Sequence, residues 1–222
     1  MDAAGYRLWI LHLNGPEGGP GRQRRATLEW PAVSRNGVFT VLSDFRRRKV
    51  SAGFDQLDVD GDGYVGNSDV EQLVKNHGDA YGYSQGAPEY AELERQTVAV
   101  WDQLKQFDTD GDGRVSLAEY VAGFEAFLSR RETFMSGMTA LVDAFYLMAD
   151  RDNDGKITEE ELVRHFRSWG HAEQQAHEAF RRLDRSANGT ISKEEWMQNL
   201  EEYYFSEDPD APGNWLTPIP DE

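Results

Sequence analysis

Three carboxylates occupy alternate positions in the segment from Asp108 to Glu119, which reads DTDGDGRVSLAE. A glycine directly follows the third carboxylate, and a glutamate comes six residues after that glycine. Carboxylates this close together repel one another, and each resists ionising beside the others. Oxygen ligands at alternating positions are also the means by which a chain surrounds a hard divalent cation. The segment therefore predicts a site for a divalent metal ion.

The same twelve-residue pattern occurs four times in the chain. The copies, called loops one to four, are Asp58–Asp69, Asp108–Glu119, Asp150–Glu161 and Asp184–Glu195. Each has oxygen-bearing side chains at positions 1, 3 and 5, glycine at position 6, an aliphatic residue at position 8 and an acid at position 12. This is the pattern of the EF-hand calcium loop. Four copies, each flanked by helical patterns, disfavour both a chance match and solvated acidic loops without metal.

The pattern assigns side-chain ligands to positions 1, 3, 5 and 12 and a backbone carbonyl ligand to position 7. Glycine at position 6 permits the sharp bend, and the aliphatic residue at position 8 suits a short β-strand that pairs one loop with its neighbour. Acids at the ligand positions number 14, so they account for most of the net charge of -17. The expected ligands are Asp58, Asp60, Asp62, Tyr64, Asp69, Asp108, Asp110, Asp112, Arg114, Glu119, Asp150, Asp152, Asp154, Lys156, Glu161, Asp184, Ser186, Asn188, Thr190 and Glu195.

The four sites are not expected to be equal. Loops two and three have the full acidic set, with Ser116 and Thr158 at position 9 able to orient a coordinating water, so they should bind calcium most strongly. Loop four has the neutral Ser186 and Asn188 at positions 3 and 5 and should bind more weakly. Loop one ends in Asp69, which is one methylene shorter than glutamate. It is expected either to hold calcium with reduced preference over magnesium, or to be empty or filled by magnesium.

Apolar residues recur at a helical period on both sides of each loop. The stripe before loop two is Val98, Trp101, Leu104 and Phe107, and the stripe before loop three includes Met138, Leu141, Val142 and Phe145. Between loops one and two, HGDAYGYSQGAPEY is typical of a turn and a helix start. The expected fold is all-α, with four helix-loop-helix hands in two pairs within one compact domain and short β pairing between loops. The expected division is an extension over 1–40, pair one over 41–130, pair two over 131–206 and a tail over 207–222.

Composition excludes several classes of protein. With 222 residues, 39% hydrophobic and 12% aromatic, the chain can bury a core and is unlike a disordered acidic polymer. There is no cysteine, so no disulfide and no thiolate site can form. No apolar run reaches the ~20 residues of a membrane span, and the patch from Leu8 to Leu11 is too short for a signal peptide. A cytoplasmic protein is expected, and the excess of arginine over lysine hints at a bacterial source.

The four loops, their irregular spacing and the C-terminal motif DPDAPGNWL resemble the sarcoplasmic calcium-binding protein family, in particular its bacterial calerythrin-like branch. The resemblance covers about residues 40–218. It implies two EF-hand pairs packed face to face and a calcium-buffering role. Many members of that family have lost one or two loops, whereas this chain retains the pattern in all four.

The tail and the first forty residues carry separate expectations. Prolines prevent a helix in the tail, while Trp215 and Leu216 are costly to leave in water. We expect the tail to fold back into a hydrophobic cleft where a sensor would bind its target; the alternative is a loose terminus. The basic segment 1–40 lacks an amphipathic period, so a solvated extension is expected rather than an arm that binds membrane or nucleic acid.

The sequence thus predicts a calcium-binding protein, most simply a monomeric buffer or transporter with up to four sites. The alternative is a sensor that exposes a hydrophobic surface to an unknown protein partner, which the presence of only five methionines disfavours. No enzyme is expected, because the five histidines have no catalytic or zinc-binding spacing. A photoprotein or luciferin carrier, using internal side chains such as His165 and Trp169, is the nearest enzyme-like alternative.

Overall fold

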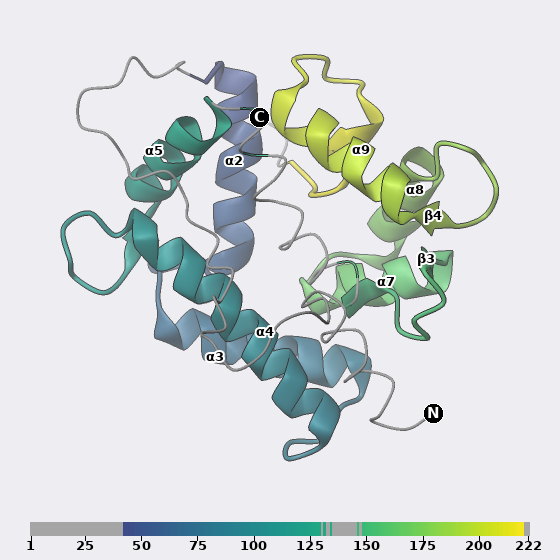
Figure 1. Cartoon of the computed structure of the whole chain (residues 1–222), viewed down its shortest axis with the longest axis horizontal. Helices are drawn as coiled ribbons and strands as arrows, with labels where there is room; N and C mark the ends of the chain where they lie inside the picture. Colours follow the sequence, from purple (N-terminus) through teal and green to yellow (C-terminus); the bar gives the residue numbers. More distant parts are fainter. Residues whose placement is uncertain (1–41, 130, 132–133, 135–145, 147, 220–222) are drawn as a thin grey trace, which may run out of the picture.

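The computed structural model describes residues 42–129, 131, 134, 146 and 148–219, and its secondary structure is almost entirely helical (Figure 1). Its elements are α2 (Asp44–Leu57), β1 (Tyr64–Val65), α3 (Asn67–Tyr81), α4 (Pro88–Leu104), the 3-10 helix η1 (Lys105–Phe107), β2 (Val115–Ser116), α5 (Leu117–Leu128), β3 (Lys156–Ile157), α7 (Glu159–Ser168), α8 (Glu173–Leu183), β4 (Ile191–Ser192), α9 (Lys193–Phe205) and the 3-10 helix η2 (Pro212–Trp215).

The loops meet in two pairs through short antiparallel strands. β1 pairs with β2, with Val65 opposite Val115, and β3 pairs with β4, with Ile157 opposite Ile191. These four position-8 side chains are at most 2% exposed. The all-α fold and the β pairing between loops are confirmed. Of the stripe expected before loop three, Met138, Leu141, Val142 and Phe145 lie outside the described residues.

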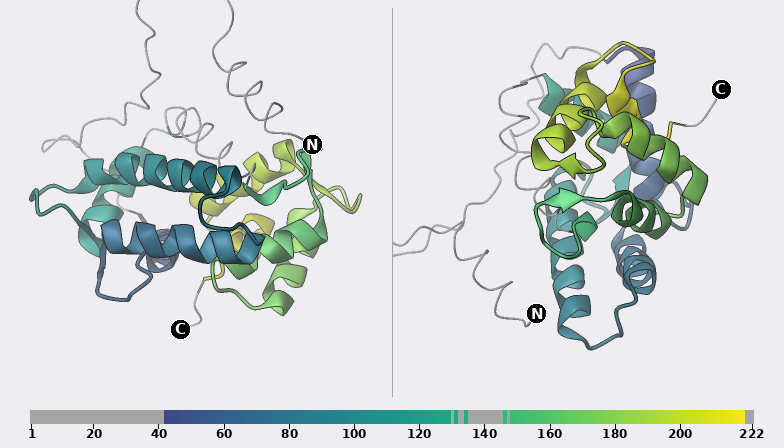
Figure 2. Two further views of the ribbon diagram at one scale, coloured as in Figure 1. Left: turned by 90° about the horizontal axis from the view of Figure 1, so that it is seen from below. Right: turned by 90° about the vertical axis from the view of Figure 1, so that its right-hand side faces the viewer.

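Helices from both pairs share one apolar core (Figures 1 and 2). α2 packs against α5 and α9, and α3 packs against α4 and, from the second pair, α7. Stacked and edge-on rings dominate the centre, for example Phe124 against Tyr204 with ring centroids 5.6 Å apart. Because this contact joins α5 to α9, the two pairs are packed against each other rather than held apart on a linker.

The segment expected to be a turn after loop one is partly helical, which corrects the sequence prediction. α3 continues through His77 and Tyr81 before Gly82 ends it with a left-handed φ of 71°. Both side chains are buried, and His77 Nδ1–H donates to the carbonyl of Leu73 at 2.7 Å. Gly78 lets α4 approach, because a Cβ there would lie 2.6 Å from the Tyr90 ring. Tertiary packing therefore extends the helix past the local turn signals.

Two further side chains differ from the sequence pattern. Val98, predicted on the apolar stripe before loop two, is 39% exposed. Lys49 is 1% exposed although it follows three arginines. Its ammonium group donates to the carbonyl of Ser206 at 2.8 Å and to Asn214 Oδ1 at 3.2 Å, so two of its three donors have protein partners. Burial lowers the pKa of Lys49 to about 8, against the opposing charge of Glu207.

Histidines line the boundary between the two pairs. The Tyr81 hydroxyl on α3 lies 3.1 Å from Nδ1 of His165 on α7, and the rings of His77 and Trp169 meet edge-on at 4.6 Å. Burial lowers the pKa of His165 to about 3, with smaller contributions from neighbouring His77 and His171. These imidazoles are therefore neutral at pH 7.

None of the described helices is long and apolar enough to cross a bilayer.

This boundary should make the fold sensitive to acid. A histidine with a depressed pKa supports the folded state above its unfolded pKa of ~6.5, and that support falls as the pH drops toward the folded value. In saturating calcium, the wild-type free energy of unfolding should fall between pH 7 and pH 5 by about 2 kcal/mol more than that of His165→Gln. Urea titrations of both proteins measure the difference. The exposed His177→Gln variant is the control, and its free energy of unfolding should depend on pH at least as steeply as that of wild type. Parallel pH dependences for wild type and His165→Gln would contradict the role of His165 in acid sensitivity.

Candidate metal centres

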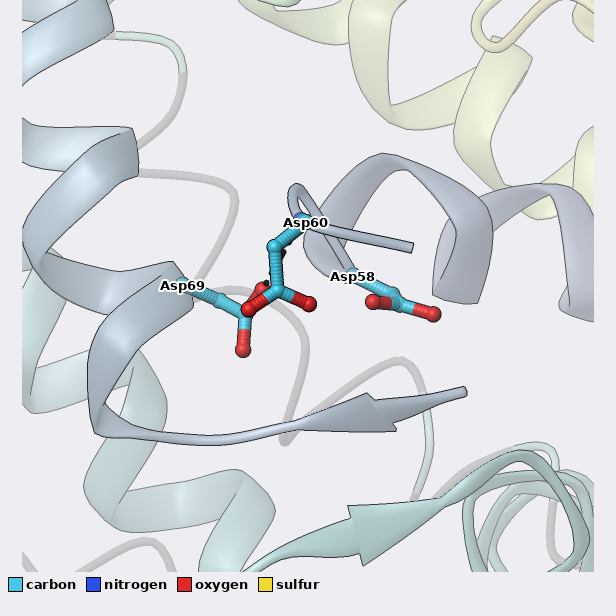
Figure 3. A group of neighbouring side chains, drawn as sticks. All are labelled: Asp58, Asp60 and Asp69. Atoms are coloured by element: carbon cyan, nitrogen blue, oxygen red, sulfur yellow. Dashed lines mark hydrogen bonds between the residues drawn. The ribbon is translucent and has the colours of Figure 1, made fainter. Parts of the chain in front are cut away.

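The fold brings carboxylates together in three of the four loops. In each group, ligand atoms from positions 1, 3 and 12 all lie within 4.8 Å of one another. The groups are Asp58, Asp60 and Asp69; Asp108, Asp110 and Glu119; and Asp150, Asp152 and Glu161. Figure 3 shows the first group, gathered in the turn that joins α2 to α3. The position-5 acids Asp62, Asp112 and Asp154 are not part of these groups.

Backbone amides fix the first ligand of each loop. Asp58 accepts hydrogen bonds from the N–H groups of Asp62 at 3.1 Å and Gly63 at 2.9 Å. Asp150 and Asp184 accept the equivalent pair of bonds, and Asp108 accepts from the position-6 glycine and from Gly111. The bend requires glycine at position 6, where φ lies between 82° and 88° in all four loops. The amides therefore hold carboxylates together that would otherwise repel.

The acid at position 12 joins the two ends of its loop. Glu119 Oε1 accepts from the N–H of Thr109 at 2.8 Å, and Oε2 accepts from the N–H of Ser116 at 3.0 Å. Partial burial raises the pKa of Glu119, but the hydrogen bonds from Ser116 and Thr109 outweigh it and lower the pKa to about 2. The carboxylate is thus ionised at neutral pH and available to a cation. Glu161 and Glu195 are held in the same way.

The hydroxyls at position 9 bond to the acid at position 12 of the same loop. Ser116 Oγ donates to Glu119 Oε2 at 2.8 Å and accepts from the Glu119 N–H at 3.3 Å, and Thr158 does the same with Glu161. These are capping boxes that begin α5 and α7. The signal was present in the sequence as serine or threonine followed three residues later by glutamate. Each hydroxyl thus starts a helix and orients a carboxylate.

Loop one is closed by the same contacts with a shorter side chain. Asp69 Oδ1 accepts from the Val59 N–H at 2.9 Å and Oδ2 accepts from the Gly66 N–H at 2.8 Å. Gly66 supplies no capping hydroxyl, and Asp69 is only 2% exposed. An aspartate that meets both amides has little reach left to chelate a large ion with two oxygens. The geometry suits a smaller coordination shell.

Loop four has the same hydrogen bonds at positions 1 and 12 as loop three, but fewer acidic side chains. Asp184 and Glu195 make the bonds described above, while Asn188 Oδ1 accepts from the Thr190 N–H at 2.9 Å. The position-7 residues of the other loops, Tyr64, Arg114 and Lys156, donate to the position-5 side chain in the same way. Ser186 and Asn188 thus occupy the ligand positions with neutral oxygens.

The donor set fits a hard divalent cation. Every side-chain ligand of the pattern is a carboxylate, hydroxyl or amide oxygen, with no imidazole or thiolate. Such sets suit calcium and magnesium, whereas zinc and copper prefer nitrogen and sulfur ligands. Carboxylates converging on one point in each of loops one to three supply the charge that such an ion needs.

Sequence comparisons agree with this chemistry. A family model described as an EF-hand domain pair matches residues 51–125, and one described as EF hand matches 141–166 and 177–200. Calerythrin of Saccharopolyspora erythraea is 26% identical over 169 residues, which cover 75% of this chain and 94% of calerythrin. The resemblance to the calerythrin-like branch is thereby confirmed.

Solved structures with the same fold include two informative cases. A coelenterazine-binding protein from Renilla muelleri, in a calcium-loaded apo form, has a TM-score of 0.64 at 22% identity, covering 79% of this chain and 98% of its own. A Streptomyces coelicolor calcium-binding protein, studied for prokaryotic calcium-mediated regulation, has a TM-score of 0.59 at 25% identity, covering 72% and 97%. The first similarity bears on the fold alone.

Lengthening the last acid of loop one should change its ion preference. In Asp69→Glu, the carboxylate can keep a backbone contact and still offer two oxygens, so preference for calcium over magnesium at loop one should rise on the order of tenfold, about 1.4 kcal/mol. Calorimetric calcium titrations with and without magnesium measure this ratio. Asp79→Glu, the same change at an exposed position of α3, is the control. Equal ratios in wild type and Asp69→Glu would refute the account of loop one.

Proposed function

The chain belongs to the EF-hand family of calcium-binding proteins, and from this premise we propose that it is a calcium buffer or transporter. Calcium would be held in up to four loops by the twenty residues named above, with magnesium competing most effectively at loop one. The observation that carries the proposal is the packing of the tail helix η2 against α8 and α9 of the fourth hand. A sensor must expose an apolar groove when calcium binds, and here the tail occupies such a space.

The tail is anchored to α9 by specific contacts. The Gly213 N–H donates to Glu202 Oε2 at 2.7 Å, and a Cβ at Gly213 would collide with the carbonyl oxygen of Asn199. Asn214 accepts from the buried Lys49 ammonium and donates to two carbonyls of the tail itself. Trp215 and Leu216 pack against the core. These contacts support a tail that competes with any target for the apolar space.

What remains of that space is small. Leu216 and Thr217 line a partly open pocket together with Tyr120, His165 and Trp196, and its volume is about 160 Å³. Sites for drug-sized ligands are on the order of 300–1,000 Å³, whereas a cavity of ~150 Å³ accommodates benzene. This pocket is smaller than such sites, and His165 and Trp169 lie at its wall. A second pocket, lined by Trp169, His171 and Pro218 among others, has a volume of about 370 Å³.

The remaining parts of the proposal rest on charge and similarity. A net charge of -17 repels nucleic acid, anionic lipid and other copies of the chain, so we propose a monomer with neither partner. We also propose that the protein is not an enzyme, because its histidines have no catalytic spacing. The similarity to bacterial calerythrin supports a cytoplasmic protein of a bacterial cell. The alternative of a sensor with a protein partner is favoured by one observation, the similarity to the Streptomyces protein studied for calcium-mediated regulation.

Buffer and sensor differ in their response to exchange of magnesium for calcium. The proposal predicts that calorimetry detects up to four calcium ions per chain, with fewer or weaker events in excess magnesium. It also predicts that ANS fluorescence changes little when calcium replaces magnesium, because no apolar surface opens. A large calcium-specific rise in ANS fluorescence in magnesium buffer would instead establish the sensor.

Undocking the tail should expose the surface that it covers. Gly213→Ala introduces the collision with Asn199, so we expect the calcium-loaded protein to bind more ANS and to lose roughly 2–4 kcal/mol of stability, the scale of burying one or two large apolar side chains. Deletion of residues 208–222 should act in the same direction. Asp210→Ala, at an exposed position of the tail, is the matched control. If both tail variants matched wild type in stability and ANS binding, the tail would have no such role.

A further inference from the structure

One arginine crosses from loop two to loop one. Arg114 is at position 7 of loop two, where the pattern uses only its backbone. Its guanidinium lies 3.3 Å from Asp112 Oδ2 in its own loop and 3.7 Å from Asp62 Oδ2 in loop one. Both aspartates are at position 5 of their loops. A single cation therefore faces a predicted calcium ligand of each loop in the first pair.

The side chain is held on loop one by packing as well as by charge. The guanidinium carbon lies 3.9 Å from the centroid of the Tyr64 ring, a cation–π contact. The aliphatic stem passes beside Gly66, where an added Cβ would be 3.5 Å from Arg114 Cγ. The β1–β2 pairing brings these residues together, since Tyr64 is opposite Ser116 in the ladder. The position of the cation thus follows from the backbone of the pair.

A positive charge at this place, on a side chain that is 45% exposed, acts on both sites in the same direction. In the absence of metal, it offsets repulsion among the eight ligand carboxylates of loops one and two. When a divalent ion enters either loop, the guanidinium repels it and competes with it for a position-5 carboxylate. The net effect is a more stable empty pair and weaker divalent binding at both sites.

We propose that Arg114 is an affinity-setting residue for both sites of the first pair, so that this pair fills at higher calcium than its loops would reach alone. The inference rests on the proposed calcium-binding function. The protein would then buffer calcium over two concentration ranges. Loop three of the second pair would fill at lower calcium than the acidic loops of the first pair.

The second pair offers a natural comparison. Its position-7 residues are Lys156 in loop three and Thr190 in loop four. Lys156 is exposed, and no ion pair joins it to another residue within the described part of the chain. The second pair therefore has a cation at the same position that does not reach across to the partner loop.

Glycine amides give a separate readout for each loop. The N–H groups of Gly63, Gly113, Gly155 and Gly189 each donate to the position-1 aspartate of their own loop, so their NMR resonances should follow the filling of that loop. The full-length chain is titrated with calcium at low salt as wild type, Arg114→Met and Arg114→Gln. Arg114→Met keeps an apolar stem beside Gly66 and removes the guanidinium with its charge.

In both variants, the titration midpoints of Gly63 and Gly113 should fall to calcium concentrations about three- to tenfold lower than in wild type. The midpoints of Gly155 and Gly189 should not change. The shift should shrink in ~0.5 M salt, where charges are screened, and Arg114→Lys should stay closer to wild type. In Lys156→Gln, Gly189 of the partner loop should be unaffected.

The decisive resonance is that of Gly63, because it reports a loop in which no residue was changed. An unchanged Gly63 midpoint, or one that moves to higher calcium in both Arg114→Met and Arg114→Gln, would overturn the assignment of Arg114. If no glycine resonance of the wild-type protein responded to calcium, the proposed function itself would fail, which is a different result.

Discussion

The repulsion among carboxylates in the loops is the constraint on which the rest of the structure depends. Fourteen acids at ligand positions carry most of the net charge, and three sets of them converge to within 4.8 Å. Backbone amides offset part of this repulsion, since each position-1 aspartate accepts hydrogen bonds from backbone N–H groups of its own loop. Divalent cations bound at the proposed sites would offset the remainder.

Each loop is also a mechanical part of the fold. The position-12 acid belongs to the first turn of the outgoing helix and accepts from an amide at the start of the loop, as Glu195 does from Ser186. An ion that fixes this carboxylate therefore fixes the direction in which α3, α5, α7 or α9 leaves its loop. Through the buried valines of β1–β2 and isoleucines of β3–β4, the geometry of one loop is linked to that of its neighbour. On the proposed function, the same few contacts would couple metal binding to folding.

The sequence predicts the local part of this arrangement and misses the tertiary part. Loop boundaries, the glycine bends and the position-8 strand pairing follow from spacing within twelve residues, and they agree with the structure. The buried Lys49, the helical His77 and the exposed Val98 depend on what packs against α2, α3 and α4, which no local pattern contains. Arg114 is the clearest case: position 7 tolerates any side chain, and only the pairing of β1 with β2 brings it against Asp62. The capping role of Ser116, by contrast, follows from a local pattern, a serine followed three residues later by Glu119.

Equilibrium dialysis of the intact chain against calcium tests the central claim most directly. With free calcium between micromolar and millimolar, the account predicts that ions accumulate to a plateau of three or four per chain, because loops one to three are closed by converging carboxylates and loop four keeps the same frame. A chain that retained no calcium across that range would contradict it.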